Sequence, residues 1–284
     1  MSAASNLALR LATAGISVPI ILGLLFGAPP WAFYLLVLGA SLVGVHELLS
    51  MTHPRDWASQ GLGVLISAAA SLIVYLRPDD SRSLLAVLVV VPVSGPILTL
   101  VRLRPIETAG LRACAMGFAP LFVVIPLTLL AVLRETWGFI GAGAVLLALG
   151  LGWFADTGAY FAGRFLGRHK LYEAVSPNKT VEGALGGLAA SVFWAVLASQ
   201  TYLRGTLPIA HAVPLGLVAG ALGQAGDLGE SLLKRSMGVK DSGAIVPGHG
   251  GVLDRVDAVI VTAVVVFLYA QWAWDGRVGC SLPK

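Results

Sequence analysis

The stretch Asp227–Asp257 reads DLGESLLKRSMGVKDSGAIVPGHGGVLDRVD, and it interrupts a sequence that is otherwise mostly apolar. It contains five carboxylates, four Lys or Arg side chains, a histidine and a Gly-His-Gly-Gly turn. An apolar segment precedes it, and the segment Ala258–Trp274 that follows carries no charge. Because packing alone does not explain so many polar groups between two apolar segments, we interpret this stretch as the working part of an enzyme at a membrane face.

The composition of the whole chain indicates that most of it lies in lipid. Of its 284 residues, 57% are hydrophobic and 12% are charged, whereas soluble domains have about 25% charged residues. Spans in a bilayer must satisfy their backbone internally, and abundant Gly and Ala favour close helix packing over a barrel. We therefore predict an all-α, polytopic integral membrane protein. The net charge of +4 does not indicate a nucleic-acid partner, and we predict none.

Apolar segments of the length that crosses a bilayer, about 20 residues, recur along the chain. The first two are separated by Pro29-Pro30, which cannot lie inside a helix without loss of hydrogen bonds. We predict about nine transmembrane helices, near residues 10–27, 31–49, 59–76, 83–101, 113–133, 137–156, 182–202, 208–226 and 252–274.

The distribution of basic residues predicts an orientation. Most of the 19 Lys and Arg residues flank the side of the membrane that holds the N-terminus and the polar loops 157–181 and 227–251. By the positive-inside rule this side is cytoplasmic. We expect a multi-pass protein of the inner (cytoplasmic) membrane with its active site on the cytoplasmic side. Residues 1–136 would form the N-terminal transmembrane helices, and residues 137–284 the catalytic transmembrane region with its cytoplasmic loops.

Four carboxylates lie at predicted span ends on this same side. Asp156 ends the sixth span, Asp227 follows the eighth, and Asp254 and Asp257 open the ninth. A charge at the bilayer centre costs about 2.5–3.5 kcal/mol, so such groups need partners. Mg²⁺, which prefers oxygen ligands, is the simplest partner. We predict Asp227 and Asp254 as the ligands of one or two ions, with Asp156 and Asp257 as further candidates.

After Asp227, polar residues recur at a spacing of three and four, which places them on one helix face. They are Glu230, Ser231, Lys234 and Arg235. Lys and Arg can hold phosphate oxygens, Arg in a bidentate fork. Two plainer interpretations stay open. The cations could simply pair with the carboxylates, or the segment could be a solvated helix on the membrane surface.

The next segment contains Lys240-Asp241-Ser242-Gly243 and Pro247-Gly248-His249-Gly250-Gly251. Glycines around a histidine allow the backbone to approach a ligand, and the helix N-terminus that follows attracts anions. His249 could position a substrate or handle a proton, or it could be an ordinary turn residue.

The basic loop after the sixth predicted span contains Ser176-Pro-Asn-Lys179-Thr180. Lys179 and Thr180 offer a charge and a hydroxyl to a phosphate, although the glycine pattern of a P-loop is missing. The alternative is a loop that contacts anionic lipid headgroups. Both interpretations hold if the substrate is itself an anionic lipid.

Taken together, these motifs resemble those of a known family. Ser231-Leu-Leu-Lys234-Arg235, Lys240-Asp241 and His249-Gly-Gly-Val-Leu-Asp254-Arg255-Val-Asp257 resemble the signature of the phosphatidate cytidylyltransferases, also called CDP-diacylglycerol synthases. Gly226–Ser231, Asp156–Arg164 and Ser176–Thr180 are similar to the companion motifs of that family. The resemblance runs from Asp156 to Asp257, while the N-terminal spans carry no comparable motif. Asn178 departs from the pattern, since many relatives have Lys or Gly there.

The resemblance implies the reaction of CTP with phosphatidate to give CDP-diacylglycerol and pyrophosphate, with Mg²⁺ required. It implies Asp227 and Asp254 as metal ligands, and it suggests a homodimer in the lipid bilayer. A monovalent cation such as K⁺ could accompany Mg²⁺. The expected catalytic residues are Asp227, Asp254, Lys234, Arg235, His249 and Arg255. The expected substrate-binding residues are Ser176, Lys179, Thr180, Ser231, Lys240, Asp241, Gly250 and Gly251.

Three other functions stay open at this point. A related enzyme could act on an isoprenoid phosphate, or a lipid kinase could use similar groups. A cation-coupled transporter would instead need acidic residues through the depth of the membrane, whereas here they cluster at one face.

Overall fold

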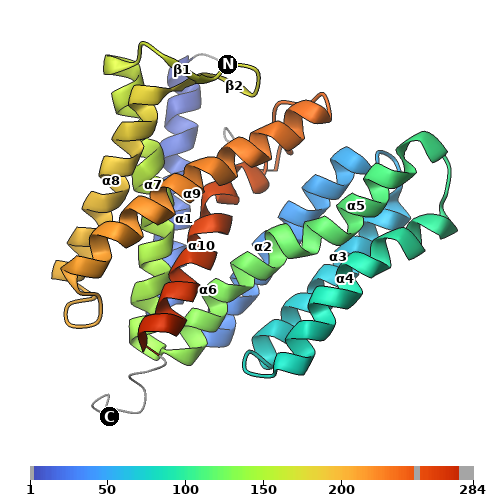
Figure 1. The fold of residues 1–284 in the computed structure, drawn as a ribbon, viewed down its shortest axis with the longest axis horizontal. Coiled ribbons are helices and arrows are strands. Elements are labelled where there is room, and N and C mark those ends of the chain that lie inside the picture. Colours follow the sequence, from blue (N-terminus) through green and yellow to red (C-terminus); the bar gives the residue numbers. More distant parts are fainter. Residues whose placement is uncertain (1–2, 246–249, 275–284) are drawn as a thin grey trace. The chain divides into compact units, whose positions relative to one another are not determined.

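The computed structural model describes residues 3–245 and 250–274, which are largely α-helical (Figure 1). The exception is a hairpin of two short antiparallel strands, β1 (Lys170–Tyr172) and β2 (Ser176–Thr180). The prediction of an all-α protein is confirmed. The helices are α1 (Ala3–Gly27), α2 (Pro30–Thr52), α3 (Trp57–Leu76), α4 (Ser81–Val101), α5 (Ala109–Ala119), α6 (Ile125–Thr136), α7 (Gly138–Leu166), α8 (Val181–Gln200), α9 (Ile209–Ser236) and α10 (Leu253–Trp274).

Within the described residues, eight helical segments are long and apolar enough to cross a membrane. One of them, Ile106–Thr136, joins a short 3-10 turn, α5, the π-helical turn Pro120–Val124 and α6. The part Gly15–Gly27 of α1 is a shorter apolar helix. These segments confirm a polytopic membrane protein with close to the predicted nine spans.

Local sequence signals set several helix ends. α1 stops at Gly27, and α2 starts with Pro30 at its first turn, where a missing N–H costs nothing. Asp56 caps α3 by accepting a hydrogen bond of 3.2 Å from the N–H of Ser59. Thr180 ends β2 and caps α8 in the same way. The predicted break at Pro29-Pro30 is therefore confirmed.

Two helices are longer than predicted. α7 continues past residue 156 to Leu166, and α9 continues past residue 226 to Ser236, so Asp156 and Asp227 lie inside helices rather than at their ends. The 29 residues of α7 span roughly 43 Å at a rise of about 1.5 Å each, which exceeds a hydrocarbon core of about 30 Å. The predicted spans end where apolar character is lost, and these two helices continue beyond that point.

The chain forms two compact units. The first contains Met1–Val132 together with Ser236–Val256, and the second contains Leu133–Arg235 together with Asp257–Lys284. The segment between α9 and α10 thus packs with the N-terminal helices, although its sequence motifs continue those of the second unit. The predicted functional division at residue 136 stays a prediction.

In the first unit, a buried arginine holds the turn between α4 and α5. The guanidinium of Arg112, only 4% exposed, donates hydrogen bonds to the carbonyls of Arg102, Leu103 and Pro105 at 2.8, 2.8 and 2.9 Å. These bonds satisfy carbonyls that follow the end of a helix. One side chain therefore fixes the entry of the chain into its next span.

In the second unit, glycines allow helices to approach at the level of their backbones. α8 runs beside α7 (Figure 1), and a Cβ at Gly158 of α7 would lie 2.5 Å from the Cβ of Ala190 and 2.6 Å from the carbonyl oxygen of Gly186. Likewise, a Cβ at Gly223 of α9 would lie 3.3 Å from the Cγ2 of Thr262 on α10. Small residues at such crossings are typical of helix packing in lipid.

We expect Gly158→Val to destabilise the protein by roughly 1–3 kcal/mol, because the added side chain would overpack the contact between α7 and α8. The matched control is Gly39→Val on α2, where a Cβ meets nothing within 4 Å. Thermal unfolding in detergent micelles measures both variants. Equal melting temperatures for the two would contradict the packing argument.

Candidate active site

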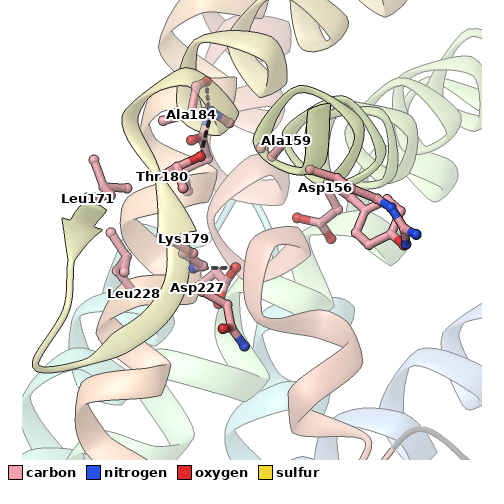
Figure 2. Close-up of a pocket in the computed structure, with 14 residues that line it drawn as sticks. Asp156, Ala159, Leu171, Lys179, Thr180, Ala184, Asp227 and Leu228 are labelled. Atoms are coloured by element: carbon pink, nitrogen blue, oxygen red, sulfur yellow. Dashed lines mark hydrogen bonds and ion pairs between the residues drawn. The ribbon is translucent and has the colours of Figure 1, made fainter. Parts of the chain in front are cut away.

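A cavity of about 490 Å³ lies in the second unit between α7, α8, α9 and the β-hairpin (Figure 2). Its polar lining comes from three of the segments singled out in the sequence. The lining residues that carry charge or hydrogen-bonding side chains are Asp156, Tyr160, Arg164, Asn178, Lys179, Thr180, Gln224 and Asp227. The structure therefore brings together groups that are up to about 70 residues apart in the chain, and places carboxylates and cations in one hollow.

An ion pair joins the two most informative of these residues. The ammonium nitrogen of Lys179, on β2, lies 2.7 Å from Oδ2 of Asp227, on α9 (Figure 2). The side chains are 28% and 23% exposed, so solvent screens the pair less than it would a surface pair. The plainer interpretation of the sequence had paired Asp227 with the cations that follow it on α9. The structure instead supplies the cation from the Ser-Pro-Asn-Lys-Thr motif.

The polar stripe on α9 is divided between two environments. Glu230, Ser231 and Lys234 are buried, and Lys234 pairs with Glu230 at 2.5 Å. Arg235 is exposed. The buried part of the predicted stripe therefore includes Glu230, Ser231 and Lys234 but not Arg235.

Asp257, on α10, is a further carboxylate near Asp227 and Asp156. Asp257 interacts electrostatically with Asp227, Asp156 and Glu230, so carboxylates from α7, α9 and α10 gather within the second unit. Oδ1 of Asp257 also accepts a hydrogen bond of 2.7 Å from the N–H of Ala258. Carboxylates brought together at a membrane helix bundle repel one another unless cations balance them.

These carboxylates suit Mg²⁺ held jointly with a phosphate. Mg²⁺ usually binds one or two protein carboxylates and completes its shell with water and substrate phosphate oxygens. Among residues 3–245 and 250–274, no group of three or more His, Cys, Asp or Glu side chains is arranged to hold a metal ion by itself. Asp227 with Asp156 or Asp257 would therefore provide an incomplete oxygen shell, which the phosphates of a nucleotide could complete.

Hydrogen bonds to the start of α8 hold the hairpin that carries Lys179. Thr180 accepts a hydrogen bond of 3.0 Å from the N–H of Gly183, at the start of α8. Glu182 accepts hydrogen bonds from the N–H groups of Arg168 and His169, at 3.0 and 3.2 Å, and contacts the His169 ring. These contacts fix both ends of the hairpin beside the cavity. Ser176 is half-buried at the start of β2 and does not line the cavity.

The other predicted site residues that the structure describes lie in the first unit, on the segment that precedes α10 and in the first turn of α10. Asp254 is 7% exposed, and its Oδ2 accepts hydrogen bonds from the N–H of Ser242, from the Ser242 hydroxyl and from the N–H of Gly251, at 3.0, 3.0 and 2.8 Å. Gly250 has a φ of 84°, and a Cβ there would meet Oδ2 of Asp254 at 2.7 Å. Asp254 thus organises the Gly-Gly turn around its carboxylate.

The remaining residues of that segment are more open. Lys240, Asp241 and Arg255 are exposed, and His249 lies outside the described residues. Because Asp227 belongs to the second unit and Asp254 to the first, their shared metal site stays a prediction.

Sequence reasoning missed several residues of these sites. Tyr160 and Arg164, whose side chains hydrogen-bond to each other at 2.7 Å, line the cavity, and so does Gln224. Glu47 of α2 accepts hydrogen bonds from the segment before α10. A signal for Glu47 was present, since it is the first charged residue after the uncharged run that starts at Leu11.

The arrangement agrees with the comparison to known families. The sequence model of the Cytidylyltransferase family matches residues 8–273 of the chain. The chain belongs to this family. The resemblance inferred from the motifs is thereby confirmed, and the match also covers the N-terminal helices that carry none of them.

Relatives of this cytidylyltransferase family member include three staphylococcal proteins named phosphatidate cytidylyltransferase. The protein of Staphylococcus epidermidis is 36% identical over 226 residues, and that of Staphylococcus saprophyticus is 35% identical over 226 residues. The protein of Staphylococcus aureus is 34% identical over 227 residues. Each alignment covers 77% of this chain and 82% of the relative.

We expect Lys179→Met to tighten Mn²⁺ binding to the nucleotide-free protein by about fivefold or more, because it removes the cation that neutralises Asp227. Electron paramagnetic resonance titration measures free Mn²⁺ directly. Lys170→Met is the control, since it removes one charge from the same hairpin but its ammonium contacts the carbonyl of Pro177. Equal Mn²⁺ affinity in the two variants would contradict a role for Asp227 in metal binding.

Proposed function

We propose that this chain transfers the cytidylyl group of CTP to phosphatidate, giving CDP-diacylglycerol and pyrophosphate. The observation that carries the proposal is the ion pair between Lys179 and Asp227. It lies in a cavity whose lining comes from three segments that resemble motifs of the cytidylyltransferase family. The relatives named phosphatidate cytidylyltransferase support the choice of substrates.

The proposed reaction is a direct displacement. An oxygen of the phosphatidate phosphate forms a bond to the α-phosphorus of CTP, and the bond from that phosphorus to the bridging oxygen breaks. Pyrophosphate leaves with the electron pair. A phosphate monoester has a second pKa near about 6, so the attacking oxygen is already largely anionic and no strong general base is needed. Catalysis then depends on positioning and on charge neutralisation.

The residues of the chain meet these two requirements in different ways. Lys179 would neutralise phosphate oxygens once it leaves Asp227. Arg164 lines the same cavity and would also neutralise phosphate oxygens. Asp227, with Asp156 or Asp257, would hold Mg²⁺. When bound, Mg²⁺ supplies positive charge against the oxygens of the transferred phosphoryl group. The proposal also includes Asp254 as a further metal ligand. It includes a second bound ion, which could be a monovalent cation such as K⁺.

In the predicted orientation the cavity faces the cytoplasm, where CTP is available, and the protein lies in the inner membrane. The diacyl chains of phosphatidate would stay in the bilayer while the headgroup enters between helices. Phe161 and Phe165, 53% and 73% exposed near the cavity end of α7, are suited to contact with lipid. A homodimer, suggested by the family resemblance, is also proposed.

The main test is formation of labelled CDP-diacylglycerol from radiolabelled CTP and phosphatidate by the purified full-length chain in detergent. We expect product only when Mg²⁺ is present. We expect Asp227→Asn to lower the rate by about 100-fold or more, since a neutral amide cannot replace the carboxylate as metal ligand.

Asp79→Asn, at an exposed position between α3 and α4, is the matched control and should keep full activity. Near-normal turnover by Asp227→Asn would remove this residue from the metal site. Product with an isoprenoid phosphate but not with phosphatidate, or γ-phosphoryl transfer from the nucleotide, would replace the proposed substrate or reaction. Cation flux in proteoliposomes without CTP turnover would favour a transporter.

A further inference from the structure

Glu47 of α2 lies at the N-terminal end of α10, within the first unit. Its Oε1 accepts a hydrogen bond of 3.0 Å from the N–H of Val252, and its Oε2 accepts one of 2.8 Å from the N–H of Leu253. The first N–H groups of a helix have no partner within the helix, and the helix dipole places partial positive charge there. A carboxylate from a helix about 200 residues earlier therefore caps α10.

The same carboxylate is linked to Asp254 through one hydroxyl. The Ser242 Oγ lies 3.1 Å from Oε2 of Glu47 and 3.0 Å from Oδ2 of Asp254. A serine hydroxyl has a single proton, so the two carboxylates share one donor. Asp254 is held further by the N–H groups of Ser242 and Gly251. A displacement of Glu47 would thus release Ser242 and change the bonds that orient Asp254.

The backbone of the segment is shaped around Glu47. A Cβ at Gly243 would lie 2.5 Å from Oε1 of Glu47, and a Cβ at Gly251 would lie 2.5 Å from Oε2. Neither position has room for a side chain while Glu47 stays in place. Gly243 and Gly251 therefore both pack against the carboxylate of Glu47.

The chemistry of the contacts requires a carboxylate. Glu47 is 3% exposed, and it takes part in none of the ion pairs found among the described residues. Backbone N–H groups, the Ser242 hydroxyl and the helix dipole balance its charge instead. A glutamine has only one acceptor atom, and its NH₂ group would face the N–H of Val252 or Leu253.

We propose that Glu47 is a positioning residue for the cytidylyl transfer: it holds Ser242 and the start of α10 in place and, through Ser242, orients Asp254. This inference rests on the proposed function for its catalytic part. It assigns a role in the site to an N-terminal helix that carries none of the family motifs.

The experiment compares the full-length chain with Glu47→Gln and Glu47→Asp. We expect Glu47→Gln to lower kcat by about 10- to 100-fold and to raise the Mg²⁺ concentration that gives the half-maximal rate, since groups that orient a metal ligand act on this scale. Glu47→Asp retains the charge and should recover part of the rate, although its carboxylate is one methylene shorter. Ser41→Ala is the control, because this buried hydroxyl of α2 donates only to the carbonyl of Leu38.

A second readout needs no catalysis. Hydrogen–deuterium exchange followed by mass spectrometry should show faster exchange of peptides that cover 240–254 in Glu47→Gln, with no change in the hairpin Lys170–Thr180. Wild-type kcat and exchange in Glu47→Gln would overturn the proposal, and so would faster exchange throughout the chain. If the wild-type chain lacks the proposed activity, local exchange in 240–254 still supports the positioning role, and the proposed reaction is what fails.

Discussion

Close approach of helix backbones is the constraint on which the second unit depends. Gly158 and Gly186 bring α7 against α8, and Gly223 and Gly226 bring α9 against α10. In lipid there is little hydrophobic gain from bringing apolar helices together, so packing at this distance has to supply much of the association. The same contacts determine where the polar side chains of these helices lie. Asp227 follows Gly226 directly and lines the cavity.

The two units stabilise buried carboxylates by different means. In the second unit, Asp227 and Glu230 form ion pairs with Lys179 and Lys234, the first pair in the cavity and the second buried. In the first unit, Glu47 and Asp254 accept hydrogen bonds from backbone N–H groups and from Ser242. An ion pair in a partly open cavity can exchange partners, whereas a capped carboxylate within a closed turn holds a fixed geometry. The first arrangement suits substrate binding and the second suits the positioning of a loop.

This division relates to the chemistry expected of a cytidylyltransferase. Attack by an anionic phosphate on a triphosphate needs reactants held in line and their charges neutralised, and it needs little proton transfer. Lys179, which is paired with Asp227, offsets the charge of one carboxylate that lines the cavity. The Gly-Gly turn donates a hydrogen bond to Asp254 through Gly251, and the next residue, Val252, donates one to Glu47. The family match across residues 8–273 includes α2, the helix that carries Glu47.

The sequence alone determined the class of the protein, the break at Pro29-Pro30 and part of the cavity lining, namely Asp156, Lys179, Thr180 and Asp227. These features depend on composition and on near neighbours, which a sequence displays directly. Only the tertiary structure decided that Lys179 faces Asp227, that Lys234 is buried while Arg235 is exposed, and that Glu47 caps α10. A charged group in a membrane protein binds whichever partner helix packing brings within reach. That partner can lie anywhere in the chain, so no local pattern identifies it.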